Sequence, residues 1–187
     1  MAFENNKPTL SNYGVDGMRE ISQRRAATIA NMIDEGKKAG ISDDFARKAI
    51  ATYGADNARG MIAGMKDAND FDEFASLFGT DHNRDIYEME VVEKTHDRLR
   101  IDFHYCPYVT EWLKQGRSPE EIAHLCDITM EGDREFAKLF PCLKFELAGT
   151  IADGQPTCQL VFTRQDGTWK IVPTQELQQL LSGYVCN

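Results

Sequence analysis

The chain has 187 residues, of which 42% are hydrophobic and 27% charged, and its formal net charge is −9. This length and composition suit a folded protein with a substantial apolar core and exclude a largely disordered chain. The negative charge and the scattered basic residues argue against nucleic acid as a partner, and the short apolar runs argue against a membrane span.

Helical patterns fill roughly the first 80 residues. Apolar residues recur at helical spacing over residues 15–36, with arginines on the other faces, which predicts an amphipathic helix. A second helix is expected after Ser42, with a bend or stop near Gly54. Asp70 and Glu73 resemble a capping box that opens a short third helix.

Strand patterns begin after residue 84. Residues 87–92 and 99–105 favour β structure, and the polar stretch between them is suited to closing a hairpin. Residues 144–151 and 157–163 flank a turn-rich link and predict a second antiparallel hairpin. Residues 169–172 are expected to add a further strand.

Two helices are predicted between the hairpins. The first covers residues 108–114 and stops at Gly116. The second starts at Pro119, where Ser118 and Glu121 form a capping-box pattern, and runs to about residue 140, with Gly132 as a point of interruption.

These elements predict an α+β fold in which N-terminal helices precede an antiparallel sheet of two hairpins with intervening helices. We expect residues 1–84 to form a helical segment and residues 85–187 to form the α+β domain that carries the site. The two parts can also fold as one compact domain.

The sequence contains five cysteines, and its N-terminus, MAFENNKPTLSNYG, lacks the pattern of a secretory signal. An odd number of cysteines in such a chain indicates free thiols and a cytoplasmic location. Cys142 lies in a loop and Cys186 is next to the terminus, and neither is assigned a role.

The strand at residues 98–106 carries the most reactive residues of the chain. Strand alternation places Arg100, Asp102, His104 and Cys106 on one face. His104 and Cys106 would then be same-face neighbours, and an imidazole near a thiol lowers its pKa and favours a thiolate nucleophile. The alternative is a solvated sheet face that ends in an inert cysteine.

Two further cysteines have weaker claims to a role. Helical spacing aligns Cys126 with Met130 and Asp133 on a mixed face, and Asp127 points about 100° away from Cys126. Cys158 alternates with apolar strand residues, so packing in the core is its simplest explanation.

No compact metal-binding motif is present, so no metal or other cofactor is expected. Zinc is the alternative, and its ligands would have to come from distant elements, such as His104, Cys106, Cys126 and Cys158. Phosphate-binding loops, dinucleotide fingerprints and the serine-hydrolase elbow are also absent from the sequence.

The segments EKTHDRLRIDFHYCPYVTEWLKQG, EEIAHLCDITMEGDREFAKLF and FELAGTIADGQPTCQLVFTR resemble the family of L-2-amino-thiazoline-4-carboxylic acid hydrolases. The likeness covers about residues 85–164. It rests on Cys-Pro after a strand, Cys-Asp on a helix, and Gly-x-x-x-Cys in a hairpin. The closing hairpin also resembles the small-molecule-binding domain named after 4-vinyl reductase.

The hydrolase resemblance implies ring opening of a small cyclic isothiourea by attack on its C=N carbon. It implies Cys106 as nucleophile or ligand, Cys126 and Cys158 in the same pocket, and Asp127 as acid or base. The residue pattern adds His104 as activator and Arg100 as a clamp for a substrate carboxylate.

Two alternatives to a hydrolase remain open. One is a related lyase or cyclase that acts on a C–N or C–S bond. The other is a non-catalytic small-molecule-binding or sensor module, whose N-terminal helices could pair across a homodimer.

Overall fold

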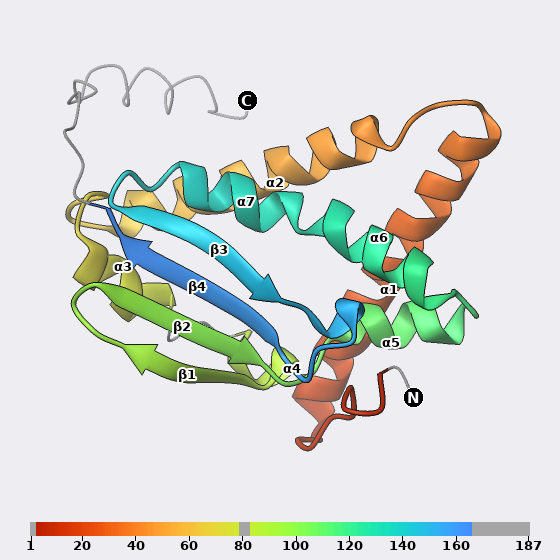
Figure 1. Ribbon diagram of the computed structural model, residues 1–187, viewed down its shortest axis with the longest axis horizontal. Helices are drawn as coiled ribbons and strands as arrows, with labels where there is room; N and C mark the ends of the chain where they lie inside the picture. The colour runs from red at the N-terminus through yellow and green to blue at the C-terminus, as the bar shows by residue number, and fades with distance from the viewer. Residues whose placement is uncertain (1–2, 79–82, 166–187) are drawn as a thin grey trace.

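The computed structural model describes residues 3–78 and 83–165 (Figure 1). The predicted strand at residues 169–172 and Cys186 lie outside these residues. The helices are α1 (Tyr13–Lys38), α2 (Asp44–Gly64), α3 (Phe71–Phe78), α4 (Arg84–Tyr87), α5 (Pro107–Lys114), α6 (Pro119–Thr129) and α7 (Glu131–Lys138). The strands are β1 (Met89–Lys94), β2 (Arg98–Phe103), β3 (Leu143–Gly149) and β4 (Cys158–Arg164), and a short 3-10 turn, η1 (Ile151–Asp153), lies between β3 and β4.

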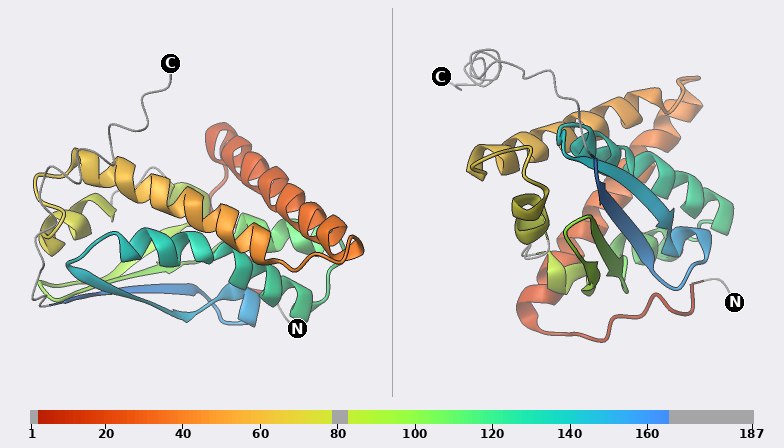
Figure 2. Two further views of the ribbon diagram at one scale, coloured as in Figure 1. Left: turned by 90° about the horizontal axis from the view of Figure 1, so that it is seen from above. Right: turned by 60° about the vertical axis from the view of Figure 1, so that its left-hand side comes forward.

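The strands form one four-stranded antiparallel sheet in the order β1-β2-β4-β3. Each predicted hairpin is present, and β2 pairs with β4 to join the two hairpins. The helices cover one face of the sheet, as the left view of Figure 2 shows. The predicted α+β fold is therefore confirmed.

Two predicted helix boundaries differ from the structure. Helix α2 runs through Gly54 without a break and ends ten residues later, at Gly64. The long helix predicted from Pro119 divides into α6 and α7 at Met130, two residues before Gly132. The capping box of Ser118 and Glu121 is present at the start of α6, as predicted.

Helix α1 buries only part of the face that its large apolar residues suggest, since Ile33 lies in the core and Ile29 packs against it. Met18, Ile21 and Met32 are exposed, and the buried residues include Ala26, Ala30 and Arg19. The small alanines let α5 pack closely, and the indole N–H of Trp112 donates to the Ala26 carbonyl at 3.2 Å. Within the described part of the chain, none of the helices is long and apolar enough to cross a membrane.

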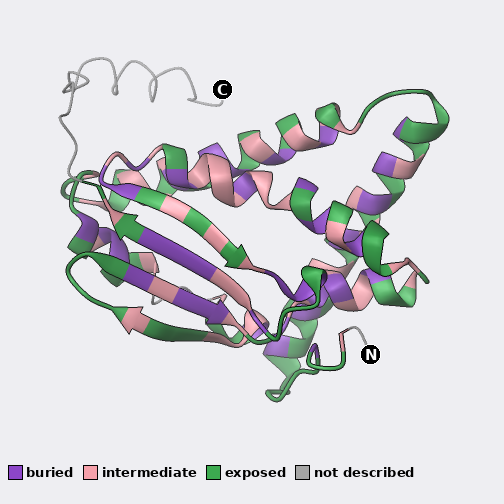
Figure 3. Cartoon of the chain, viewed as in Figure 1, coloured by how far each residue is buried: buried purple, intermediate pink, exposed green. Residues whose placement is uncertain are grey.

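The interior consists of two apolar clusters, and buried residues mark the strands β2 and β4 at the centre of the sheet (Figure 3). One cluster joins α1, α2, α5, α6 and η1, and the other joins α2, α3, α7 and the sheet. Both clusters contain residues from before and after residue 85. The side chain of Cys158 packs against both, at the junction of the two clusters.

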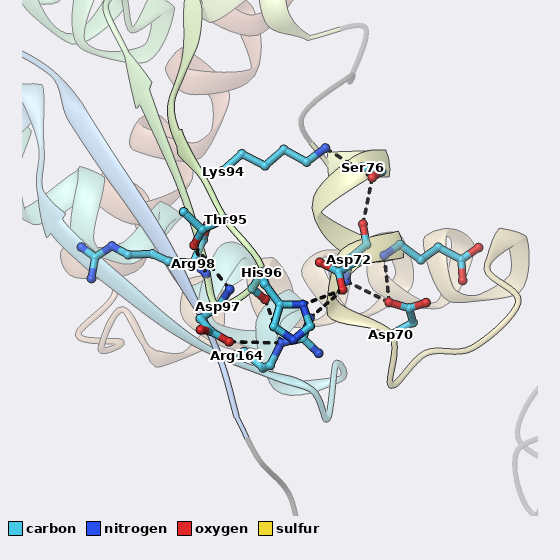
Figure 4. Close-up of polar contacts among 10 residues, drawn as sticks. Asp70, Asp72, Ser76, Lys94, Thr95, His96, Asp97, Arg98 and Arg164 are labelled. Atoms are coloured by element: carbon cyan, nitrogen blue, oxygen red, sulfur yellow. Dashed lines mark hydrogen bonds and ion pairs between the residues drawn. The ribbon is translucent and has the colours of Figure 1, made fainter.

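A polar cluster ties α3 to the sheet at the end of the first hairpin (Figure 4). One carboxylate oxygen of Asp72 lies 3.1 Å from Nδ1 of His96 and accepts a hydrogen bond from Arg164 at 2.8 Å. Arg164 also donates to the backbone carbonyl of His96. These contacts are exposed, so each of them adds little to the stability of the fold.

Helices α2 and α7 approach each other closely where α2 crosses the start of α7. A Cβ added to Gly54 would overlap the carbonyl group of Gly132 and lie only 2.6 Å from its carbonyl carbon. The two backbones are therefore in direct contact, and only glycine fits at position 54.

We predict that Gly54→Ala lowers the free energy of unfolding by about 3 kcal/mol, because the methyl group forces α2 and α7 apart. Chemical denaturation followed by circular dichroism measures this change. The matched control is Gly60→Ala in the same helix, where an added Cβ meets no atom within 4 Å. That variant should gain about 0.5–1 kcal/mol from helix propensity. Equal effects of the two substitutions would contradict the proposed backbone contact.

Candidate active site

A cavity of about 900 Å³ lies between the helical layer and the ends of β2 and β4. Its wall is mostly apolar and aromatic, with a few reactive or charged groups. Such a wall is typical of small-molecule sites. The polar and reactive groups in the wall are Arg25, Tyr53, Asn57, Asn83, Tyr87, Cys106, Tyr108, Cys126, Thr129, Asp133 and Cys158.

Cys106 is the N-cap residue of α5, directly after the extended segment that follows β2. Its backbone is held at both ends by one buried side chain, because the Asn6 amide accepts from the Cys106 N–H at 2.7 Å and donates to the Cys106 carbonyl at 3.1 Å. Asn6 also donates to the Thr110 hydroxyl at 3.0 Å. The position of this thiol is therefore fixed by the N-terminal segment as well as by α5.

Burial raises the pKa of the Cys106 thiol above its ordinary value. The backbone N–H groups of Val109 and Tyr108, at the start of α5, lower the pKa of this thiol. The thiol lies near these groups but does not form a capping hydrogen bond with them. Proximity to a helix N-terminus favours a thiolate. In the resting protein, burial outweighs this effect and the neutral thiol is favoured.

Cys126 and Cys158 line the same cavity as Cys106. Burial also raises the pKa values of both thiols, and the proximity of Cys106 raises these pKa values further. The sulfur of Cys158 accepts a hydrogen bond from the Ile151 N–H at 3.3 Å. The three cysteines singled out from the sequence therefore converge on one space, while each of them also contacts the apolar core.

The structure places His104 and Arg100 away from this cavity. His104 Nε2 lies 2.9 Å from a carboxylate oxygen of Glu90 and is exposed. Arg100 forms two 2.8 Å hydrogen bonds with Asp102. Arg100 lies on the sheet face opposite the helices, because strand alternation sends Leu99 and Ile101 into the core and their neighbours outward. His104 lies on the same face, where it contacts Glu90, the cross-strand partner of Asp102.

Cys106 does not share that outer face, because β2 ends at Phe103. Phe103 itself lines the cavity, and alternation no longer governs the chain beyond it. The chain turns into α5 and directs Cys106 inward. The expected imidazole–thiol pair is therefore not formed, since strand alternation was extended past the end of the strand.

Asp127 lies on the surface of α6 and does not line the cavity. Its carboxylate pairs with Arg47 at 2.8 Å and with Arg134 at 2.6 Å. Burial acts to raise its pKa, but the hydrogen bonds from Arg134 and Arg47 outweigh it and hold the pKa below its ordinary value. In this arrangement Asp127 joins α2, α6 and α7.

Two charged residues of the cavity were not selected from the sequence. Asp133 lines the cavity near the start of α7, and burial raises its pKa to about 6. Arg25 reaches the cavity from α1, with its guanidinium carbon 4.1 Å from the centre of the Tyr53 ring. Helical spacing had placed Asp133 on the Cys126 face, which was the available signal. No pattern distinguished Arg25 from its neighbour Arg24.

Among residues 3–78 and 83–165, no three His, Cys, Asp or Glu side chains are grouped closely enough to hold a metal ion. The four zinc ligands considered from the sequence do not form such a group, since His104 faces away from the three cysteines.

One comparison with known proteins identifies a similar family. A family model described as L-2-amino-thiazoline-4-carboxylic acid hydrolase matches residues 19–162. The matched region contains every cysteine that lines the cavity, together with Arg25 and Asp133. No curated protein matches the chain.

We predict that Asp133→Asn stabilises the fold above pH 6, by on the order of 2–3 kcal/mol. The folded pKa of about 6 lies above the ordinary value of 3.8. Stability is therefore lost as the pH rises between these values, because the unfolded chain ionises first. Replacing the carboxylate with a neutral amide removes this penalty.

The measurement is the difference in unfolding free energy between the variant and the wild type at pH 4 and at pH 7.5. The difference should be near zero at pH 4 and largest at pH 7.5. Asp153→Asn serves as a control. Asp153 lies in η1, and its carboxylate accepts a hydrogen bond from the Thr150 hydroxyl. Its replacement should therefore lower the free energy of unfolding. A constant difference for Asp133→Asn across this range would refute the assignment.

Proposed function

Since the chain belongs to the L-2-amino-thiazoline-4-carboxylic acid hydrolase family, we propose that it hydrolyses a small cyclic amidine or isothiourea of the aminothiazoline-carboxylate type. The observation that carries this proposal is the convergence of Cys106, Cys126 and Cys158 on one cavity. The cavity volume of about 900 Å³ leaves room for a small heterocycle together with water.

We assign the nucleophile to Cys106. Its sulfur adds to the ring carbon that is bonded to two nitrogens and to the ring sulfur. The C–S bond of the ring then breaks, the ring sulfur leaves as a thiol after taking up a proton, and the carbon stays attached to Cys106. Water next adds to this carbon, Cys106 departs, and the product carries a urea group and a free thiol.

Cys106 is the preferred nucleophile among the three thiols because of its surroundings. Only its sulfur lies at a helix N-terminus, where backbone N–H groups favour negative charge. The raised pKa of the resting thiol means that substrate must help to form the thiolate. An amidine substrate is cationic when protonated, and a nearby cation lowers the pKa of a thiol. The family's substrate type thus provides the activation that His104, on the opposite face of the sheet, does not.

Attack by an activated water is the alternative route within the same reaction class. In that route, the cysteines bind the ring and a general base removes a proton from water. A lyase or cyclase that acts on a C–N or C–S bond would use the same cavity.

Binding without turnover is the second candidate function. Burial raises the pKa of all three cavity thiols, and this favours a binding module because a neutral thiol is a poor nucleophile. Turnover of the substrate separates the two candidates, because a binding module holds the ligand and releases it unchanged.

We predict that Cys106→Ala lowers the rate of ring opening of L-2-amino-thiazoline-4-carboxylate by at least about 100-fold, because the covalent route is removed. Release of the free thiol product, followed colorimetrically, measures the rate. Binding of the substrate, measured by calorimetry, should change little because the charged groups of the cavity remain.

The matched control is Cys142→Ala, which alters a buried cysteine of the other apolar cluster. Cys142 does not line the cavity, and this variant should retain full activity. Full activity of Cys106→Ala would contradict the assignment of the nucleophile and would favour attack by an activated water. Absence of turnover by the wild type, with intact substrate binding, would support the binding module instead.

A further inference from the structure

Two side chains of opposite charge line the cavity without an ion-pair partner. Among the described residues, neither Arg25 nor Asp133 forms a salt bridge with another side chain. Their neighbours in sequence do form pairs, since Arg24 binds Glu20 and Arg134 binds Asp127 and Glu131. The unpaired charges are thus the two that face the cavity, and the paired ones lie outside it.

Arg25 lies where the cavity meets solvent. Its guanidinium stacks over the ring of Tyr53, a residue that is 47% exposed. Burial acts to lower the pKa of Arg25, but Tyr108 and Tyr53 outweigh it and the net shift is upward. The guanidinium is therefore permanently charged, and its N–H groups can form two parallel hydrogen bonds with a carboxylate.

Asp133 lies deeper, within the packed side of the cavity. The charged and titratable groups around it are Arg25, Tyr53, Tyr87, Tyr108 and Cys158, with Arg134 on its own helix. No other described side chain hydrogen-bonds to its carboxylate. An ionised carboxylate in such surroundings is stabilised by a cationic ligand that offers N–H groups.

We propose that Arg25 and Asp133 are the substrate-binding residues that orient the ring, with Arg25 holding the substrate carboxylate and Asp133 holding the amidine nitrogens. The inference rests on the proposed function for the identity of the substrate. Its physical basis is independent, because the two unpaired charges line the same cavity as the nucleophile. Together they hold the two polar ends of a small ring and leave its amidine carbon for Cys106.

A pair of substrates separates the two roles. L-2-Amino-thiazoline-4-carboxylate carries both groups, and 2-amino-2-thiazoline lacks only the carboxylate. We predict that Arg25→Gln lowers kcat/KM for the first compound by about 10- to 100-fold and changes kcat/KM for the second by less than about 3-fold. Arg25→Lys should restore part of the loss, and Arg24→Gln, on the same helix, should leave both compounds unaffected.

Asp133→Asn should weaken the binding of both compounds by a similar factor of at least about 10, because both compounds carry the amidine. For the wild type, binding should strengthen as the pH rises through about 6, where Asp133 ionises, and the variant should lose this dependence. Because Asp133→Asn is expected to be more stable than the wild type above pH 6, unfolding would not account for a loss of binding there.

Calorimetry with both compounds on the Cys106→Ala background tests the inference even without turnover. If Arg25→Gln binds the two compounds with similar affinity while the Arg25 protein prefers the one with the carboxylate, the inference is supported whatever reaction the wild type catalyses. An equal effect of Arg25→Gln on the two compounds, or none on either, would overturn the role of Arg25. Unchanged affinity and unchanged pH dependence in Asp133→Asn would overturn the role of Asp133. Intact binding without ring opening by the wild type would contradict the proposed function alone.

Discussion

The direct contact between the backbones of Gly54 and Gly132 sets the geometry of the helical side of the cavity. Any side chain at position 54 would separate α2 from α7, so the crossing distance is fixed by the absence of a Cβ. Tyr53 and Asp133 are the chain neighbours of these glycines, and both line the cavity. A glycine inside a helix costs about 1 kcal/mol in helix propensity. The close packing of the two helices offsets this cost and at the same time places a tyrosine and a carboxylate in the wall.

The opposite side of the cavity depends on polar anchors that reach across the sequence. The buried side chain of Arg19 donates to the carbonyls of Asp85 and Ile86 and pairs with Glu88 at 2.9 Å, which ties α1 to the segment before β1. Its guanidinium also lies over the ring of Tyr105, one residue before Cys106. A buried pair of this kind adds little net stability, but loss of one partner leaves an uncompensated charge. These anchors therefore restrict where the chain that carries Cys106 can go.

The sequence was informative where the structure follows from local rules. The hairpins, the capping box at Ser118 and the interest in Cys106 all follow from residue types at short spacing. The resemblance to the hydrolase family, and not the spacing, placed Cys126 and Cys158 in the same pocket as Cys106. Local rules were insufficient where tertiary packing decides direction. Arg24 and Arg25 on α1 have the same helix propensity. Packing against neighbouring elements decides that Arg25 faces the cavity while Arg24 pairs with Glu20 on the surface. Cys106 shows the same limit, because strand alternation is valid only up to Phe103, where β2 ends.

In the proposed reaction, the charges around the cavity control when the nucleophile forms. Burial disfavours both the thiolate of Cys106 and the carboxylate of Asp133 in the resting protein. The charges of Arg25 and Arg134 offset this only in part at Asp133, which has no ion-pair partner among the described side chains. A cationic ligand stabilises both ionised forms at once, since one positive charge lowers the pKa of every acid around it. A neutral ligand of the same shape would leave the thiol protonated. In the proposed mechanism, therefore, the charge of the substrate itself generates the nucleophile, so the reaction would favour amidines although the described residues that line the cavity include no histidine.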